Sequence, residues 1–76
     1  MERNAVAVTY DAMERTMVGP IEPFTSQPWP QVLHAANEAS AEVDLVSTYR
    51  DGQELWVVCL PIGGGWDYEY WLVEAA

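Results

Sequence analysis

Two carboxylates, Asp67 and Glu69, alternate with aromatic residues near the end of the sequence. In a strand, residues two apart lie on the same side and are separated by about 6.7 Å. Two phosphate steps along one DNA strand, at about 3.4 Å each, span a similar distance. The spacing therefore predicts a surface that binds cationic side chains and competes for a groove that otherwise holds phosphates.

Further residues extend this candidate surface. Glu54 belongs to the preceding strand-like run, and Glu38 and Glu42 share one face of an expected helix. Tryptophan and tyrosine are favoured at the centres of protein interfaces, and a strand with two apolar faces can bury only one of them against a single helix. The predicted partner-binding residues are Asp67, Glu69, Glu54, Glu38, Glu42, Trp66 and Tyr68.

Other reactive side chains have simpler interpretations. His34, the only histidine, stands four residues before Glu38, but no third metal ligand follows at a recognisable spacing. Cys59, the only cysteine, lies in the most apolar run and is expected to be a buried, inert thiol. Carboxylates alone can hydrolyse glycosides, but a chain of 76 residues hardly shapes a substrate cleft. We expect no enzyme, no metal and no cofactor.

The composition indicates the chemistry of a partner. Twelve acidic residues stand against three arginines and no lysine, which gives a formal net charge of −9. This charge exceeds the roughly two to eight charges that keep a small domain soluble, and it repels itself in the compact state. It favours a basic protein partner and argues against direct binding of nucleic acid or of an anionic membrane. No secretory signal or membrane span is expected, so the chain is predicted to be cytoplasmic.

The first half of the chain must supply a hairpin and a helix. Residues 4–10 and 13–18 alternate as strands do, with Asp11-Ala12 as the expected turn. Residues 19–30 contain four of the five prolines, so we expect neither a strand nor a helix there, only a loop. Its expected apolar anchors are Ile21, Phe24 and Trp29. A helix is expected over residues 30–41, with Pro30 in its first turn.

The second half reads as three strands. Residues 43–49 and 54–60 flank Asp51-Gly52, a strong hairpin signal. Pro61 is expected to end the second of these strands, Gly63-Gly64-Gly65 to turn the chain, and residues 67–73 to form the last strand. The order ββαβββ predicts one α+β domain over residues 1–76, an antiparallel sheet of four to five strands with one helix packed on it.

In size, acidity and lack of lysine, and in placing Asp67 and Glu69 beside Trp66 and Tyr68, the chain resembles the small acidic inhibitors of phages and mobile elements. These include anti-CRISPR and DNA-mimic proteins, which share no defining motif. The resemblance implies a non-enzymatic inhibitor that occupies a basic, nucleic-acid-binding surface of a host defence complex. The alternative is a homo-oligomeric structural or accessory protein, whose aromatics pair edge to edge and whose acidity serves solubility only.

Overall fold

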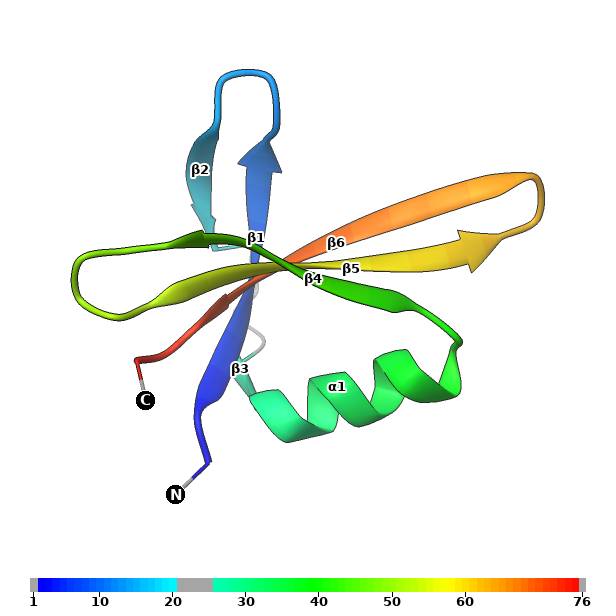
Figure 1. Cartoon of the computed structure of the whole chain (residues 1–76), viewed down its shortest axis with the longest axis horizontal. Helices are drawn as coiled ribbons and strands as arrows, with labels where there is room; N and C mark the ends of the chain where they lie inside the picture. Colours follow the sequence, from blue (N-terminus) through cyan, green and yellow to red (C-terminus); the bar gives the residue numbers. More distant parts are fainter. Residues whose placement is uncertain (1, 21–25, 76) are drawn as a thin grey trace.

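The computed structural model describes residues 2–20 and 26–75, which form six strands and one helix in the order βββαβββ (Figure 1). This confirms the α+β class with one helix on an antiparallel sheet, although the sheet has six strands instead of four or five. Ile21 and Phe24, the expected loop anchors, lie outside the described residues. The elements are β1 (Asn4–Asp11), β2 (Thr16–Pro20), β3 (Ser26–Pro28), α1 (Trp29–Glu38), β4 (Glu42–Thr48), β5 (Glu54–Ile62) and β6 (Gly65–Val73).

All strand pairs are antiparallel, and the strand order in the sheet is β2-β1-β6-β5-β4, with β3 paired to the start of β1. The first hairpin therefore joins the main sheet through β1 and β6. β5, apolar on both faces, has a neighbour on each side, as expected for such a strand. The last strand, β6, lies at the centre of the order.

The prolines interrupt the strands less than the sequence predicted. β2 continues to Pro20, and Ser26–Pro28 forms a short strand, although residues 19–30 were expected to contain none. β5 also continues through Pro61 to Ile62. A proline lacks only the N–H group, so it fits where that group would meet no neighbouring strand. β4 pairs with β5 only as far as Cys59, which leaves that side of Pro61 open.

The two turns have different causes. The strand expected from residue 13 begins only at Thr16, because the Asp11 carboxylate accepts hydrogen bonds from the backbone N–H groups of Met13 (2.9 Å) and Glu14 (3.2 Å). The hairpin at Asp51-Gly52 is confirmed. Gly52 has a φ of 88°, a conformation that favours glycine.

Helix α1 begins at Trp29, with Pro30 in its first turn as predicted, but it ends at Glu38 instead of residue 41. Ser40 has a φ of 57° and reverses the chain. The amides of Ser40 and Ala41 donate back to carbonyls of the last helical turn at 3.1 and 2.9 Å. This Schellman motif satisfies carbonyls that would otherwise be unpaired, and it terminates the helix.

The main core lies between α1 and one face of the sheet. The Trp29 ring packs against Trp56, with ring centroids 5.7 Å apart and planes inclined by 43°. Leu33, expected on the apolar side of the helix, is partly exposed. The buried residues of this cluster are Ala5, Trp29, Val32, Ala36, Val58, Trp71 and Val73.

The opposite face of the sheet has no helix, yet Val8 and Leu55 on that face are buried. Their strand partners are Tyr70 and Leu72. On this face a hollow of about 440 Å³ is lined both by the β1–β2 hairpin and by the β4 end of the sheet, so the sheet curls and brings its two ends toward each other. Its lining residues are Tyr10, Ala12, Arg15, Val46, Ser47, Tyr49 and Tyr70.

Candidate functional site

Asp67 and Glu69 lie in the outer half of β6, opposite Leu60 and Val58 of β5. Because Val58 belongs to the core beneath α1, both carboxylates lie on the helix side of the sheet. Both are exposed. Within residues 2–20 and 26–75, neither makes a side-chain hydrogen bond or an ion pair. Their charges are therefore free to meet a partner.

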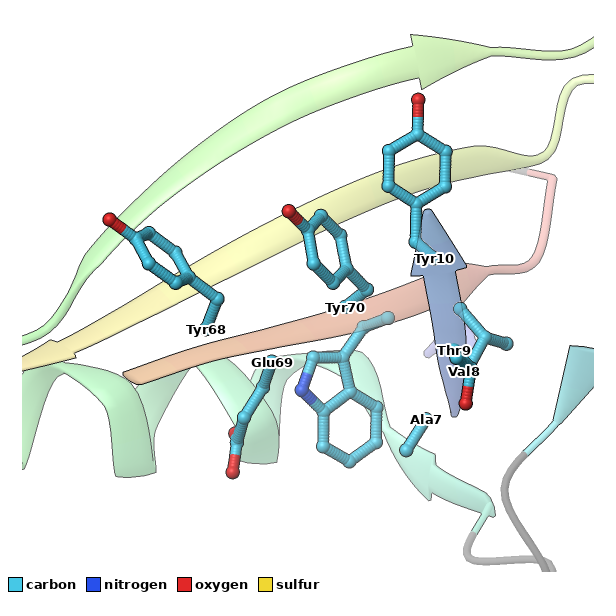
Figure 2. Close-up of a pocket in the computed structure, with 8 residues that line it drawn as sticks. Ala7, Val8, Thr9, Tyr10, Tyr68, Glu69 and Tyr70 are labelled. Atoms are coloured by element: carbon cyan, nitrogen blue, oxygen red, sulfur yellow. The ribbon is translucent and has the colours of Figure 1, made fainter. Parts of the chain in front are cut away.

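The two predicted aromatic anchors face the other way. Trp66 and Tyr68 alternate with the acids along β6 and are 51% and 57% exposed. Figure 2 shows Tyr68 and Tyr70 on one side of β6 and Glu69 on the other. The structure thus keeps charge and aromatic surface on one strand but presents them on opposite faces of the sheet.

We call the helix-free side of the sheet around Tyr10, Tyr68 and Tyr70 the tyrosine face. The rings of Tyr10 and Tyr70 pack with centroids 5.0 Å apart and planes inclined by 41°. This contact connects β1 to β6 close to the point where the two strands separate (Figure 2).

Glu42 also belongs to the tyrosine face and not to a helix, because it lies in β4 opposite Cys59, whose other partner is Tyr68. Asp44, two residues further along β4, lies on the same face. Sequence reasoning did not include Asp44 in the site. The signal that identifies it is the same two-residue strand spacing that selected Asp67 and Glu69.

Cys59 is partly exposed beside these two carboxylates. Burial raises the pKa of the Cys59 thiol above its ordinary value, and the negative charges of Asp44 and Glu42 raise it further. A raised pKa keeps the thiol protonated at neutral pH, which makes it a poor nucleophile. The raised pKa is in keeping with the predicted inert thiol, but the prediction that Cys59 is buried is wrong, because the residue is partly exposed.

Glu54 has an intramolecular partner. The Arg3 guanidinium lies 2.9 Å from its Oε1 atom, and the Trp56 indole donates a hydrogen bond of 3.0 Å to the same atom. The hydrogen bond from Trp56, followed by that from Arg3, lowers the pKa of Glu54. Glu54 lies four residues along β5 from Val58, the partner of Glu69, a separation of about 13 Å. Its charge is thus largely offset and distant from the Asp67–Glu69 pair.

Glu38 stands near the end of α1, where its Oε1 atom lies 2.7 Å from His34 Nε2 on an exposed surface. Among the residues that the structure describes, no group of three or more histidine, cysteine, aspartate or glutamate side chains is placed to hold a metal ion. In the same residues, no helix has the length and apolar character needed to cross a membrane.

Four exposed carboxylates gather at one end of the sheet, which we call the acidic end. All four lie opposite a short stretch of β5, residues 57–60, and the described part of the chain offers none of them an intramolecular ion pair. They are Glu42 and Asp44 on the tyrosine face, and Asp67 and Glu69 on the helix side.

Comparison of the chain with protein-family models, with curated proteins and with solved structures finds no match. The function must therefore be argued from the site.

Proposed function

We propose that this protein is a non-enzymatic inhibitor that binds a basic protein surface, of the kind that otherwise holds nucleic acid. The observation that carries the proposal is the acidic end. Four carboxylates without intramolecular ion pairs project there from both faces of the sheet. Oriented charges of one sign steer association with an oppositely charged surface and set its register.

The wider charge distribution supports the same proposal. Of the acidic residues in the described part of the chain, all are exposed except Glu54, which is partly buried and is also the one that pairs with an arginine. Asp67 and Glu69 keep the two-residue spacing of about 6.7 Å, close to two phosphate steps of a DNA strand. Trp66 and Tyr68 supply exposed aromatic surface on the opposite face of the same strand.

In this proposal the protein acts as a monomer in the cytoplasm of a host cell, in the manner of anti-CRISPR and DNA-mimic proteins. It uses no cofactor, and it does not bind nucleic acid or membranes itself. Its partner is a nucleic-acid-handling complex, for instance a CRISPR–Cas effector, which the inhibitor blocks stoichiometrically.

Affinity capture from host lysate on the immobilised protein tests the proposal. A nucleic-acid-binding protein should be captured, released by raising salt from about 0.1 to 1 M, where the screening length falls to about 3 Å, and displaced by DNA. The double substitution Asp67→Lys and Glu69→Lys should abolish this capture while the far-ultraviolet circular dichroism stays unchanged.

A charge-matched control separates this surface from net charge. Glu2→Lys with Glu14→Lys changes the total charge equally at exposed positions outside the acidic end, and it should retain capture. Equal capture by both double variants and the parent would overturn the assignment to Asp67 and Glu69. Equal loss of capture in both double variants would show that net charge, and not the position of the carboxylates, determines binding.

The alternative is a homo-oligomer whose exposed aromatics pair between copies. The exposure of Trp66 and Tyr68 favours it. Sedimentation equilibrium over a hundredfold range of concentration distinguishes the two: a constant monomer mass supports the inhibitor, and a mass that rises with concentration supports the oligomer.

A further inference from the structure

Strand β6 has a free edge over half of its length. It pairs with β5 from Gly65 to Val73, but with β1 only from Tyr70 to Val73. Val8 and Tyr70 form the last β1–β6 pair. Beyond it the β1–β2 and β5–β6 hairpins separate (Figure 1). No strand in the described part of the chain pairs with residues 65–69 on the side away from β5. Unpaired N–H and C=O groups on such an edge are a template for another strand.

The space beside this edge is hollow. A cavity of about 330 Å³ opens between the diverging strands, which we call the β1–β6 fork (Figure 2). Thr9 and Tyr10 line it from β1, and Tyr68, Glu69 and Tyr70 line it from β6. The fork thus has both a free backbone edge and room next to it.

The side chains along the free edge are sorted by face. Trp66 and Tyr68 lie on the tyrosine face, and Asp67 and Glu69 lie on the helix side. A strand added to this edge would alternate in the same way, with every second residue opposite a carboxylate and the others opposite an aromatic ring. Pairs of opposite charges and aromatic–β-branched pairs across neighbouring strands each stabilise a sheet.

We propose that the β1–β6 fork binds an extended basic segment of a partner protein, which adds to residues 65–69 of β6 as a further strand. The segment carries lysine or arginine at every second position and β-branched or other apolar residues between them. Strand addition of this kind takes affinity from backbone hydrogen bonds and specificity from alternate side chains.

Charge complementarity selects this occupant over a second copy of the chain. An antiparallel pairing of two β6 edges would bring Asp67 and Glu69 of one copy close to the same carboxylates of the other. Like charges on neighbouring strands are destabilising. The acids thus oppose self-association at the edge and favour a basic strand there.

This inference rests on the proposed function for the positive charge of the partner, and it adds the mode of binding. The test uses the full-length, ¹⁵N-labelled protein and a synthetic seven-residue peptide of alternating valine and lysine. The control peptide has the same composition, with its three lysines adjacent. Affinity is measured by fluorescence anisotropy and location by amide chemical shifts.

The alternating peptide should bind about tenfold more tightly than the control, as two or three cross-strand pairs would provide. Shift changes should concentrate at residues 65–69 and at Thr9 and Tyr10. Methylating the backbone nitrogens that face β6 should abolish binding, whereas methylating those on the other edge of the peptide should not, because only one edge can pair.

Two double variants test which carboxylates attract the lysines of the peptide. Asp67→Asn with Glu69→Gln should reduce affinity for the alternating peptide, and Glu42→Gln with Asp44→Asn, an equal change at the same end of the sheet, should have a much smaller effect. Equal binding of both peptides, or binding by both methylated forms, would overturn strand addition while leaving the basic-partner proposal intact. Absence of all peptide binding would also overturn strand addition, and the capture experiment described above would still decide the basic-partner proposal separately.

Discussion

Arg3 and Glu54 lie 51 positions apart in the sequence, and their side chains meet at 2.9 Å beside the Trp56 indole, which donates to the same carboxylate at 3.0 Å. The contact connects the segment before β1 to the start of β5. In the sheet, β6 lies between β1 and β5, so the pair meets only after β6 has paired with both strands. It also removes Glu54 from the set of free carboxylates.

The first prediction concerns acid stability. The hydrogen bonds from Trp56 and Arg3 hold the pKa of Glu54 below its ordinary value of 4.5. A lowered folded-state pKa means that this stabilisation is fully present above about pH 4.5 and is lost as the pH falls through the folded-state value. Glu54→Gln should therefore lower the free energy of unfolding by about 0.5–1 kcal/mol at pH 7, and less below pH 4.

Urea denaturation at pH 7, 5 and 3.5 measures this effect. Glu74→Gln is a control, because that carboxylate accepts its hydrogen bond from a backbone N–H group and not from Arg3. If the difference between Glu54→Gln and the parent stayed constant down to pH 3.5, the pair would not be the cause of the lowered pKa.

The second prediction concerns the helix-free face. Leu55 is fully buried there, whereas Leu45 in the neighbouring edge strand is 49% exposed. Leu55→Ala should lower the free energy of unfolding by about 2–5 kcal/mol, the range for a buried leucine. The same substitution at Leu45 should change it by much less, about 0.5–1 kcal/mol. Similar losses in urea denaturation of the two variants would contradict a sheet that curls over Leu55.

The third prediction concerns the Cys59 thiol. Its pKa is raised by burial and then by Asp44 and Glu42, so the pH midpoint of its alkylation by iodoacetamide should lie above that of the same thiol in urea-unfolded protein. Asp44→Asn with Glu42→Gln should move the midpoint down, because two negative charges are removed. The pH midpoint is the informative quantity, because the accessibility of the thiol changes the alkylation rate at high pH and not the pH at which half of that rate is reached.

A control for this measurement is Asp67→Asn with Glu69→Gln, which removes two charges on the other face of the sheet. It should leave the Cys59 midpoint close to that of the parent. Equal shifts in both double variants would mean that net charge, and not the neighbouring pair on β4, raises the pKa.

Local pattern was enough to predict most of the elements. Alternation indicated the strands, Asp51-Gly52 indicated their hairpin, and Pro30 indicated where the helix begins. These signals succeed because each depends on the dihedral preferences and side-chain periods of adjacent residues. They fail where a distant group decides the outcome. β3 forms because β1 offers it a partner, and Pro61 is tolerated because β4 has already ended.

For the site, the excess of negative charge and the alternation of acids with aromatics along β6 can be read directly from the order of the residues. Which of these charges are free depends on the folded sheet, because Arg3 reaches Glu54 across it while the described residues leave Asp67 and Glu69 without such a partner. It also placed Glu42 and Asp44 beside Cys59, and it opened the fork where β1 leaves β6. The twist and register of a sheet set these distances, and both depend on pairings between residues remote in the chain.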